Sequence, residues 1–367
     1  MYFDIDPKFK TYFKNLKQVF LYITDECNLR CIHCLYKPNL IFCLQNKEIK
    51  LNIAKALICD MRKLGALKLT LIGGEPTLYG KTENHRPLLN LIAKAKRIGY
   101  EYVRISTNGQ FSKELLKPSK FQKLDEIAFS LDSSSAEIND SIRGKGSFDR
   151  CVKNVKEAIQ RGFKTSITCC IHSKLLNTDK NGKLNLELMI EFAESLNVDL
   201  INFHDLFKCG VPMDTWTGNI NPSVEKWIEV YSEISKNNQL KKYDVSIRLP
   251  RCFITLEEFK KNPDYYGYCP VKLGERVMIH PNGIIRICSN LICSPYHIAK
   301  YNEKRIIWNN TYSNETLDHE LEIFTPCTNR SKNKYNNYVP LCFSFKPNQD
   351  EFIWKNLQWD KKRYNNI

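Results

Sequence analysis

Two spacings of apolar residues alternate along the chain from residue 18 to about residue 205. Short apolar runs, of the length of a buried strand, are separated by stretches in which apolar residues recur every three or four positions, as on one face of a helix. These patterns predict strands and helices in regular alternation. The strands are expected at residues 18–24, 67–72, 100–106, 124–131, 164–171 and 199–204, and the helices at 51–64, 87–98, 148–161, 184–196 and 221–236.

Strands that alternate with helices of this length predict an α/β fold with a parallel sheet. Unusual polar motifs follow four consecutive strands, each at the carboxyl end of its strand. In parallel barrels the loops that follow the strands converge on one face and carry the active site. The arrangement therefore predicts a partial (β/α)6 TIM barrel with its site at the carboxyl ends of the strands.

The pattern changes beyond residue 242, where helical spacing is lost and proline, aromatic residues and isolated cysteines dominate. We place a domain boundary near residues 238–245, within a polar stretch. The predicted organisation is an N-terminal extension at 1–17, the partial barrel at 18–240 and a small C-terminal domain at 241–367.

The composition indicates in which cellular compartment the protein works. The 367 residues are 43% hydrophobic, enough for a full core. No segment approaches the ~20 apolar residues of a membrane span, and the first residues lack the apolar stretch of a signal peptide. A cytoplasmic protein is expected, and its fifteen cysteines indicate metal ligands or free thiols rather than disulfides. The net charge of +15 is dispersed, which argues against nucleic-acid binding and leaves an acidic substrate or peptide partner open.

Three cysteines lie directly after the first strand, with the spacing Cys-x3-Cys-x2-Cys at Cys27, Cys31 and Cys34. Thiolates are the usual protein ligands of a [4Fe–4S] cluster, and three of them leave one of its four irons open for a small molecule. A zinc site is the alternative, with His33 as the fourth ligand. The motif favours the cluster, because structural zinc sites usually show paired Cys-x2-Cys or Cys/His halves.

The motif Gly73-Gly74-Glu75-Pro76 follows the second strand, 39 residues after Cys34. Together with the three cysteines it resembles the radical S-adenosylmethionine (SAM) superfamily. The resemblance implies that SAM chelates the open iron through its amino and carboxylate groups, and that the Gly73–Pro76 motif contacts the amino group. It also implies reductive cleavage of SAM to a 5′-deoxyadenosyl radical, with a donor such as flavodoxin or ferredoxin supplying the electron.

The same resemblance assigns further SAM contacts. The strand ends carrying Asn108, Ser130 and Asp132 are expected beside the ribose and nearby SAM groups, although Asn108-Gly109 is also an ordinary turn dipeptide. Arg143 is expected to pair with the SAM carboxylate, a task that suits its planar fork. Tyr36 is expected to cover the adenine.

The C-terminal part contains the pattern Cys-x13-Gly-x4-Cys, from Cys269 to Cys288, around the hairpin signal Pro281-Asn282-Gly283. It resembles the opening half of SPASM and Twitch domains, which hold auxiliary [4Fe–4S] clusters. A Cys-x2-Cys pair is missing, so one auxiliary cluster is expected. The preferred ligands are Cys269, Cys288, Cys327 and Cys342, with Cys293 as a competitor; inert buried cysteines are the alternative.

Several functions remain open. The first is maturation of a ribosomally synthesised peptide. Only about 17 residues precede the first strand, so a leader-binding domain would have to be a separate protein. The second is a dehydrogenase or epimerase acting on a small molecule such as an aminosugar, in which Cys209 could return a hydrogen atom, although a structural role for this cysteine is simpler. The third is a binding module that has lost its chemistry, which the intact motifs argue against.

Overall fold

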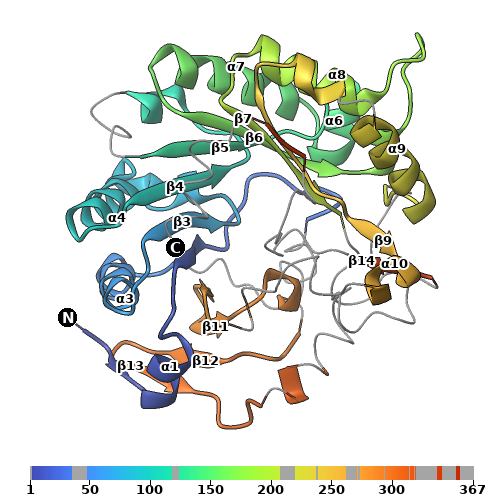
Figure 1. The fold of residues 1–367 in the computed structure, drawn as a ribbon. Helices are drawn as coiled ribbons and strands as arrows, with labels where there is room; N and C mark the ends of the chain where they lie inside the picture. The colour runs from blue at the N-terminus through green and yellow to red at the C-terminus, as the bar shows by residue number, and fades with distance from the viewer. Residues whose placement is uncertain are drawn as a thin grey trace.

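The computed structural model describes most of the chain as helices, strands and the connections between them (Figure 1). The described residues are 2–34, 48–117, 124–206, 220–236, 239–261, 271, 273–292, 294–313, 315–317, 319, 337–340 and 353–355.

All six predicted strands are present, and each pairs in parallel with the next one along the chain. Their bounds lie within two residues of the predicted ones. The strands are β2 (Gln18–Thr24), β3 (Lys68–Gly73), β4 (Tyr102–Thr107), β5 (Glu126–Ser130), β6 (Thr165–Ile171) and β7 (Leu200–Asp205). The prediction of an α/β fold built on a parallel sheet is confirmed.

Helices follow the outside of the curved sheet in Figure 1. The five predicted helices are α3 (Leu51–Lys63), α4 (Arg86–Arg97), α7 (Ser147–Gln160), α8 (Asn185–Ser195) and α9 (Val224–Lys236). In α4, for example, Leu88, Leu91, Ile92 and Ala95 are buried, which is the one-sided stripe that anchors a helix to a sheet. A short helix, α6 (Ala136–Arg143), was not predicted; it begins at Ser135, whose side chain accepts a hydrogen bond from the Ile138 amide.

The sheet continues beyond the six strands on both sides. β8 (Ser246–Leu249) pairs in parallel with β7, and β10 (Arg276–Ile279) pairs in parallel with β2. The predicted hairpin around residues 281–283 is present, because β11 (Ile284–Arg286) runs antiparallel to β10. The other described elements are β1 (Asp4–Ile5), α1 (Pro7–Tyr12), β9 (Phe253–Thr255), α10 (Leu256–Lys261), β12 (Ala299–Tyr301), β13 (Arg305–Trp308), β14 (Tyr338–Pro340) and β15 (Ile353–Lys355). One hydrogen-bonded sheet therefore spans the predicted boundary near 238–245, and β1 joins it through β13.

The two faces of the sheet differ in character. Alternate residues such as Leu69, Leu71 and Ile105 are fully buried in the main apolar core. The intervening positions point to the inner side and include many polar groups, among them Gln18, Thr70, Arg104 and Glu126. No helix in the described part of the chain is long and apolar enough to cross a membrane.

Candidate iron–sulfur and cofactor site

The three motif cysteines lie on one loop, residues 25–34, which we call the cysteine loop. It leaves the carboxyl end of β2, and Cys27, Cys31 and Cys34 are all partly exposed and free of disulfide bonds. The loop is tied to α6 by two contacts. The Ile32 amide donates to the carbonyl oxygen of Ile142 at 2.9 Å, and Cys31 Sγ lies 3.8 Å from the carbonyl oxygen of Arg143.

The glycine pair that follows β3 packs directly on the cysteine loop. The Gly74 amide donates to the Thr24 carbonyl at 2.8 Å, and the Glu75 amide donates to the Glu26 carbonyl at 2.7 Å. A Cβ atom on Gly73 would collide with the Thr24 carbonyl oxygen, and one on Gly74 with that of Glu26. In this structure the glycines therefore allow two backbone segments of the protein to approach each other.

Glu75 joins the carboxyl ends of β3 and β4. Its carboxylate is 1% exposed and accepts from the Thr77 amide at 3.0 Å, and from the Thr77 hydroxyl, the Thr107 hydroxyl and the Asn108 amide at 2.7 Å each. Burial raises the pKa of Glu75 above its usual range, and these donors oppose that effect by stabilising the charged form. Thr107 belongs to the strand end that was expected near SAM, whereas Thr77 was not predicted, and neither was expected to contact Glu75.

Asn108 connects β4 to the cysteine loop. Its Nδ2 donates to Asn28 Oδ1 at 2.9 Å and lies 3.7 Å from Cys27 Sγ. Ser130, the last residue of β5, is partly exposed, and its carbonyl oxygen lies 3.7 Å from Cys151 Sγ. The structure thus brings the ends of β2, β3 and β4 together around the cysteines.

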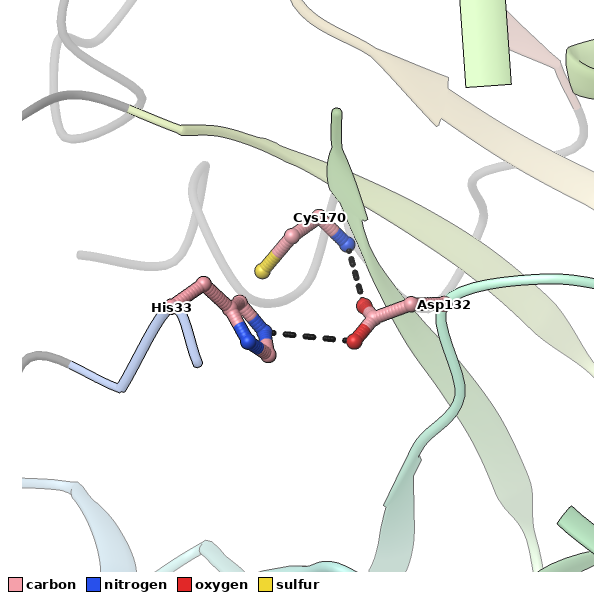
Figure 2. Close-up of side chains that lie close together, drawn as sticks. All are labelled: His33, Asp132 and Cys170. Atoms are coloured by element: carbon pink, nitrogen blue, oxygen red, sulfur yellow. Dashed lines mark hydrogen bonds and ion pairs between the residues drawn. The ribbon is translucent and has the colours of Figure 1, made fainter. Parts of the chain in front are cut away.

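Asp132 lies at the centre of a second group of contacts, after the end of β5. Figure 2 shows its carboxylate in contact with His33 of the cysteine loop and with the backbone nitrogen of Cys170 of β6. One oxygen, Oδ1, accepts from the Cys170 amide at 2.9 Å. The other, Oδ2, is 2.6 Å from Arg143 Nε and 3.2 Å from His33 Nε2. Burial alone would raise the pKa of Asp132, but the Arg143 guanidinium and His33 lower that pKa well below its usual range.

His33, Asp132 and Cys170 also have the composition of a metal site, since one ligand atom from each lies within 4.8 Å of the others. The charge of this carboxylate is balanced by Arg143, whose Nε lies 2.6 Å from Asp132 Oδ2. Figure 2 shows His33 turned toward Asp132. We therefore interpret these side chains as a structural network.

The chemistry of the cysteine loop fits an iron–sulfur cluster. Three accessible thiols stand on one loop, and thiolates are the ligands that such clusters take. In the metal-free protein burial raises the pKa of Cys27 to about 11, so iron binding must displace a proton from this thiol.

Cys288 is the one proposed auxiliary ligand that lies within the described residues. It is 9% exposed and stands at the start of a 3-10 turn after β11. The β10 end of the hairpin is close to the cysteine loop, because Tyr22 of β2 stacks on His280 with ring centroids 4.4 Å apart. Cys34 packs against the same apolar group of Tyr22, Met278 and Ile292. The remaining predicted residues, Tyr36, Cys209, Cys269, Cys293, Cys327 and Cys342, lie outside the described residues.

Comparison with protein families decides the class of this site. Residues 21–176 match the model of the radical SAM superfamily. That segment contains the cysteine loop, the Gly73–Pro76 motif, Asp132 and Arg143. This segment is a radical SAM superfamily domain. The predicted superfamily and its fold are thereby confirmed.

Curated relatives of this chain include GTP 3′,8-cyclases. The protein of Limosilactobacillus fermentum is 32% identical over 39% of this chain and 41% of its own length. That of Lactiplantibacillus plantarum is 32% identical over 39% of this chain and 42% of its own length. The aligned part of the chain thus spans about two fifths of the length of these relatives.

Solved structures with the same fold include peptide-bound proteins. Streptococcus suis SuiB bound to its precursor peptide SuiA superposes with a TM-score of 0.60 at 17% identity, covering 80% of this chain and 64% of SuiB. The anSMEcpe structure with bound AdoMet and the Cp18Cys peptide gives a TM-score of 0.57 at 15% identity, covering 78% of this chain and 77% of that protein. At this level of identity the similarity is one of fold.

Proposed function

We propose that the enzyme holds a [4Fe–4S] cluster on Cys27, Cys31 and Cys34, cleaves SAM reductively and abstracts a hydrogen atom from its substrate. Such a cluster supplies one open iron for SAM and the electron that converts it to methionine and a 5′-deoxyadenosyl radical. The observation that carries the proposal is the packing of the Gly73–Pro76 motif on the cysteine loop. It puts the expected SAM contacts next to the expected cluster ligands.

The described side chains have distinct tasks in this proposal. Glu75 and Asn108 border the cysteine loop and are suited to bind the amino group and ribose of SAM, while Ser130 contributes from the end of β5. Arg143 is suited to the carboxylate, because its pair with Asp132 is made through Nε at one edge of the fork. A guanidinium held by one edge presents its other edge to a second anion.

A peptide is our first candidate substrate. SuiB and anSMEcpe share the fold, and their structures contain a precursor peptide and the Cp18Cys peptide, respectively. The net charge of +15 would favour an acidic peptide. A separate leader-binding protein and an electron donor such as flavodoxin or ferredoxin complete this scheme in the cytoplasm.

A small anionic molecule is the second candidate, and the inner face of the sheet favours it. Lys68, Arg104, Arg248 and Arg276 are all buried there, each 6% to 8% exposed. Arg104 lies 3.5 Å from Glu126. The sequence relatives are named for GTP, an anionic substrate. A dehydrogenase or epimerase of a small molecule uses the same radical chemistry, with Cys209 as the proposed hydrogen donor.

We further propose one auxiliary [4Fe–4S] cluster on Cys269, Cys288, Cys327 and Cys342, with Cys293 as the competing ligand. The hairpin that precedes Cys288 supports this proposal, because it presents the cysteine just beyond β11. The expected adenine cover, Tyr36, remains a prediction.

The test is anaerobic reconstitution with iron and sulfide, reduction with dithionite and addition of SAM. We expect 5′-deoxyadenosine by mass spectrometry even without substrate. Glu75→Gln should reduce its yield more than tenfold, because the amide removes a buried negative charge beside the expected ammonium group. Absence of the product with SAM, with GTP and with peptides encoded next to the gene would refute the proposed reaction. Deuterium transfer from one of these candidates into 5′-deoxyadenosine would identify the substrate class.

A further inference from the structure

Five contacts converge on Asp132 from three separate parts of the chain. The carboxylate contacts His33 of the cysteine loop, Arg143 at the end of α6 and the Cys170 amide of β6. The backbone is held as well, since the Asp132 amide donates to Asn139 Oδ1 at 3.0 Å and its carbonyl oxygen is 2.8 Å from His172 Nε2.

The resemblance to the family suggested that Asp132 touches SAM, and its environment argues for a different task. The side chain is 0% exposed; Oδ1 accepts a hydrogen bond from the Cys170 amide, and Oδ2 lies at ion-pair distance from Arg143 Nε and His33 Nε2. Its negative charge is already paired with the Arg143 guanidinium, unlike that of Glu75, whose hydrogen-bond donors are all neutral. Its effect must therefore pass through the groups that it holds.

Those groups are the ones that frame the site. His33 lies between Cys31 and Cys34 in the chain, so the position of its ring fixes the path of the cysteine loop. Arg143 contributes its carbonyl oxygen to Cys31 and its Nε to Asp132, which leaves the terminal nitrogens as the part of the fork that can turn to a ligand. One carboxylate thus aligns the cysteine loop with the arginine.

We propose that Asp132 is a positioning residue, which sets the geometry between the cysteine loop and the Arg143 fork without contacting SAM. The inference rests on the proposed function, because it takes Cys27, Cys31 and Cys34 as cluster ligands and Arg143 as the carboxylate contact. Outer partners of metal ligands and ligand-binding groups typically change affinity about 10- to 100-fold when they are replaced.

The experiment compares reconstituted wild-type enzyme with Asp132→Asn and with Asp140→Asn. The Asp140 carboxylate is on α6, the helix that ends at Arg143, and it contacts Gly146, Ser147 and Phe148 at the turn to α7, so its variant controls for general disturbance of α6. We expect Asp132→Asn to keep about four irons at the cysteine loop, to bind SAM 10- to 100-fold more weakly, and to change the electron paramagnetic resonance shift that SAM induces in the reduced cluster. Asp140→Asn should match wild type in all three.

Coupling to the arginine is tested with Arg143→Lys and the double variant Asp132→Asn/Arg143→Lys. If Asp132 acts through the fork, the double variant binds SAM within twofold of Arg143→Lys alone. Independent, multiplicative losses would overturn the inference. A wild-type dissociation constant and spectrum in Asp132→Asn would also overturn it, while a wild-type enzyme that holds no cluster would instead refute the proposed function.

A third comparison serves if Asp132→Asn does not fold. His33→Gln and Arg143→Lys keep the buried carboxylate and each remove one of its partners. We expect their effects on SAM binding to deviate at least threefold from a simple product, because both side chains share one oxygen of Asp132. Effects that multiply without deviation would contradict the inference.

Discussion

The half of the molecule from β2 to β7 and the half from β8 onward share one sheet, apart from the separate pair of β9 and β14, but are organised differently. In the first half, the loops after consecutive parallel strands bring Glu75, Asn108 and Asp132 to the cysteine loop, through hydrogen bonds to Glu26 and Asn28 and an ion pair with His33. In the second half, the described residues place Cys288 after a hairpin of short antiparallel strands. The ends of consecutive parallel strands lie side by side, so the residues that follow them form one site. An auxiliary site in the second half would depend instead on contacts between loops that are far apart in the sequence.

Removing the motif cysteines should have the largest effect, because it abolishes the site of the first half and leaves the second half intact. In the triple variant Cys27/Cys31/Cys34→Ala we expect 5′-deoxyadenosine to fall at least about 1,000-fold, because no open iron remains to bind SAM. Iron analysis of the same variant separates the halves, since about four irons should remain if the C-terminal cysteines hold a cluster. Cys59→Ala, a partly exposed cysteine on α3, is the control and should match wild type. A variant without iron would leave no auxiliary cluster, and one that still forms 5′-deoxyadenosine would refute the cysteine assignment.

Asp132→Asn should cause the next largest effect, on folding of the metal-free protein. Removing one member of a buried ion pair costs about 3–5 kcal/mol, because the other charge stays buried. The pKa of Asp132 is lowered in the folded state, so its contribution is fully present above about pH 4 and is lost only as the pH falls further. Urea denaturation should therefore show a constant difference from wild type between pH 8 and 5. A difference that shrinks between pH 8 and 5 would contradict the assignment to this carboxylate.

Gly74→Ala tests the contact between β3 and the cysteine loop. Its added methyl collides with the Glu26 carbonyl, and such overpacking costs about 1–3 kcal/mol. We expect lower stability and incomplete iron loading, since the loop must move. Gly162→Ala is the control, because its added methyl meets no neighbouring atom. This glycine has φ +78°, so the variant should lose some stability, but it should keep its iron. Equal iron loading in the two variants would show that the close contact has no role in shaping the site.

The smallest effect is expected at the junction of the two halves. Tyr22→Leu removes the ring that stacks on His280, and stacked aromatic pairs contribute about 0.5–1.5 kcal/mol beyond their buried area. A double-mutant cycle with His280→Leu measures this coupling directly in urea. A coupling free energy near zero would indicate that hydrogen bonds between β2 and β10, rather than side chains, hold the halves together.

Much of the first half could be predicted from the sequence because its elements are long and periodic. β2 occupies the predicted residues 18–24, and α3 ends one residue before its predicted end. The eight-residue helix α6 and the four-residue strand β8 are too short for periodicity to mark them. Their signals, a serine cap and a short alternation of polar and apolar residues, are common in loops as well.

The sequence indicated which residues belong to the site, but not which of them contact one another. The spacing of the cysteines and the glycine motif identified the chemistry, since both lie within single loops. The ion pair of Asp132 with Arg143, and the hydroxyls around Glu75, arise only when several strand ends meet. The domain division near 238–245 remains a prediction, and the continuous sheet shows that such a division would pass between paired strands.

The pairing of β10 with β2 has a consequence for the order in which the protein is made. At roughly 5–20 residues per second, a ribosome releases β10 some 10 to 50 seconds after β2. Throughout that interval β2 is an unpaired edge strand of the growing chain, and the cysteine loop follows directly from this edge strand. Iron delivered during translation would therefore reach the cysteine loop before β10 has paired with β2. Slowing or hastening synthesis should then alter how many molecules acquire their cluster correctly.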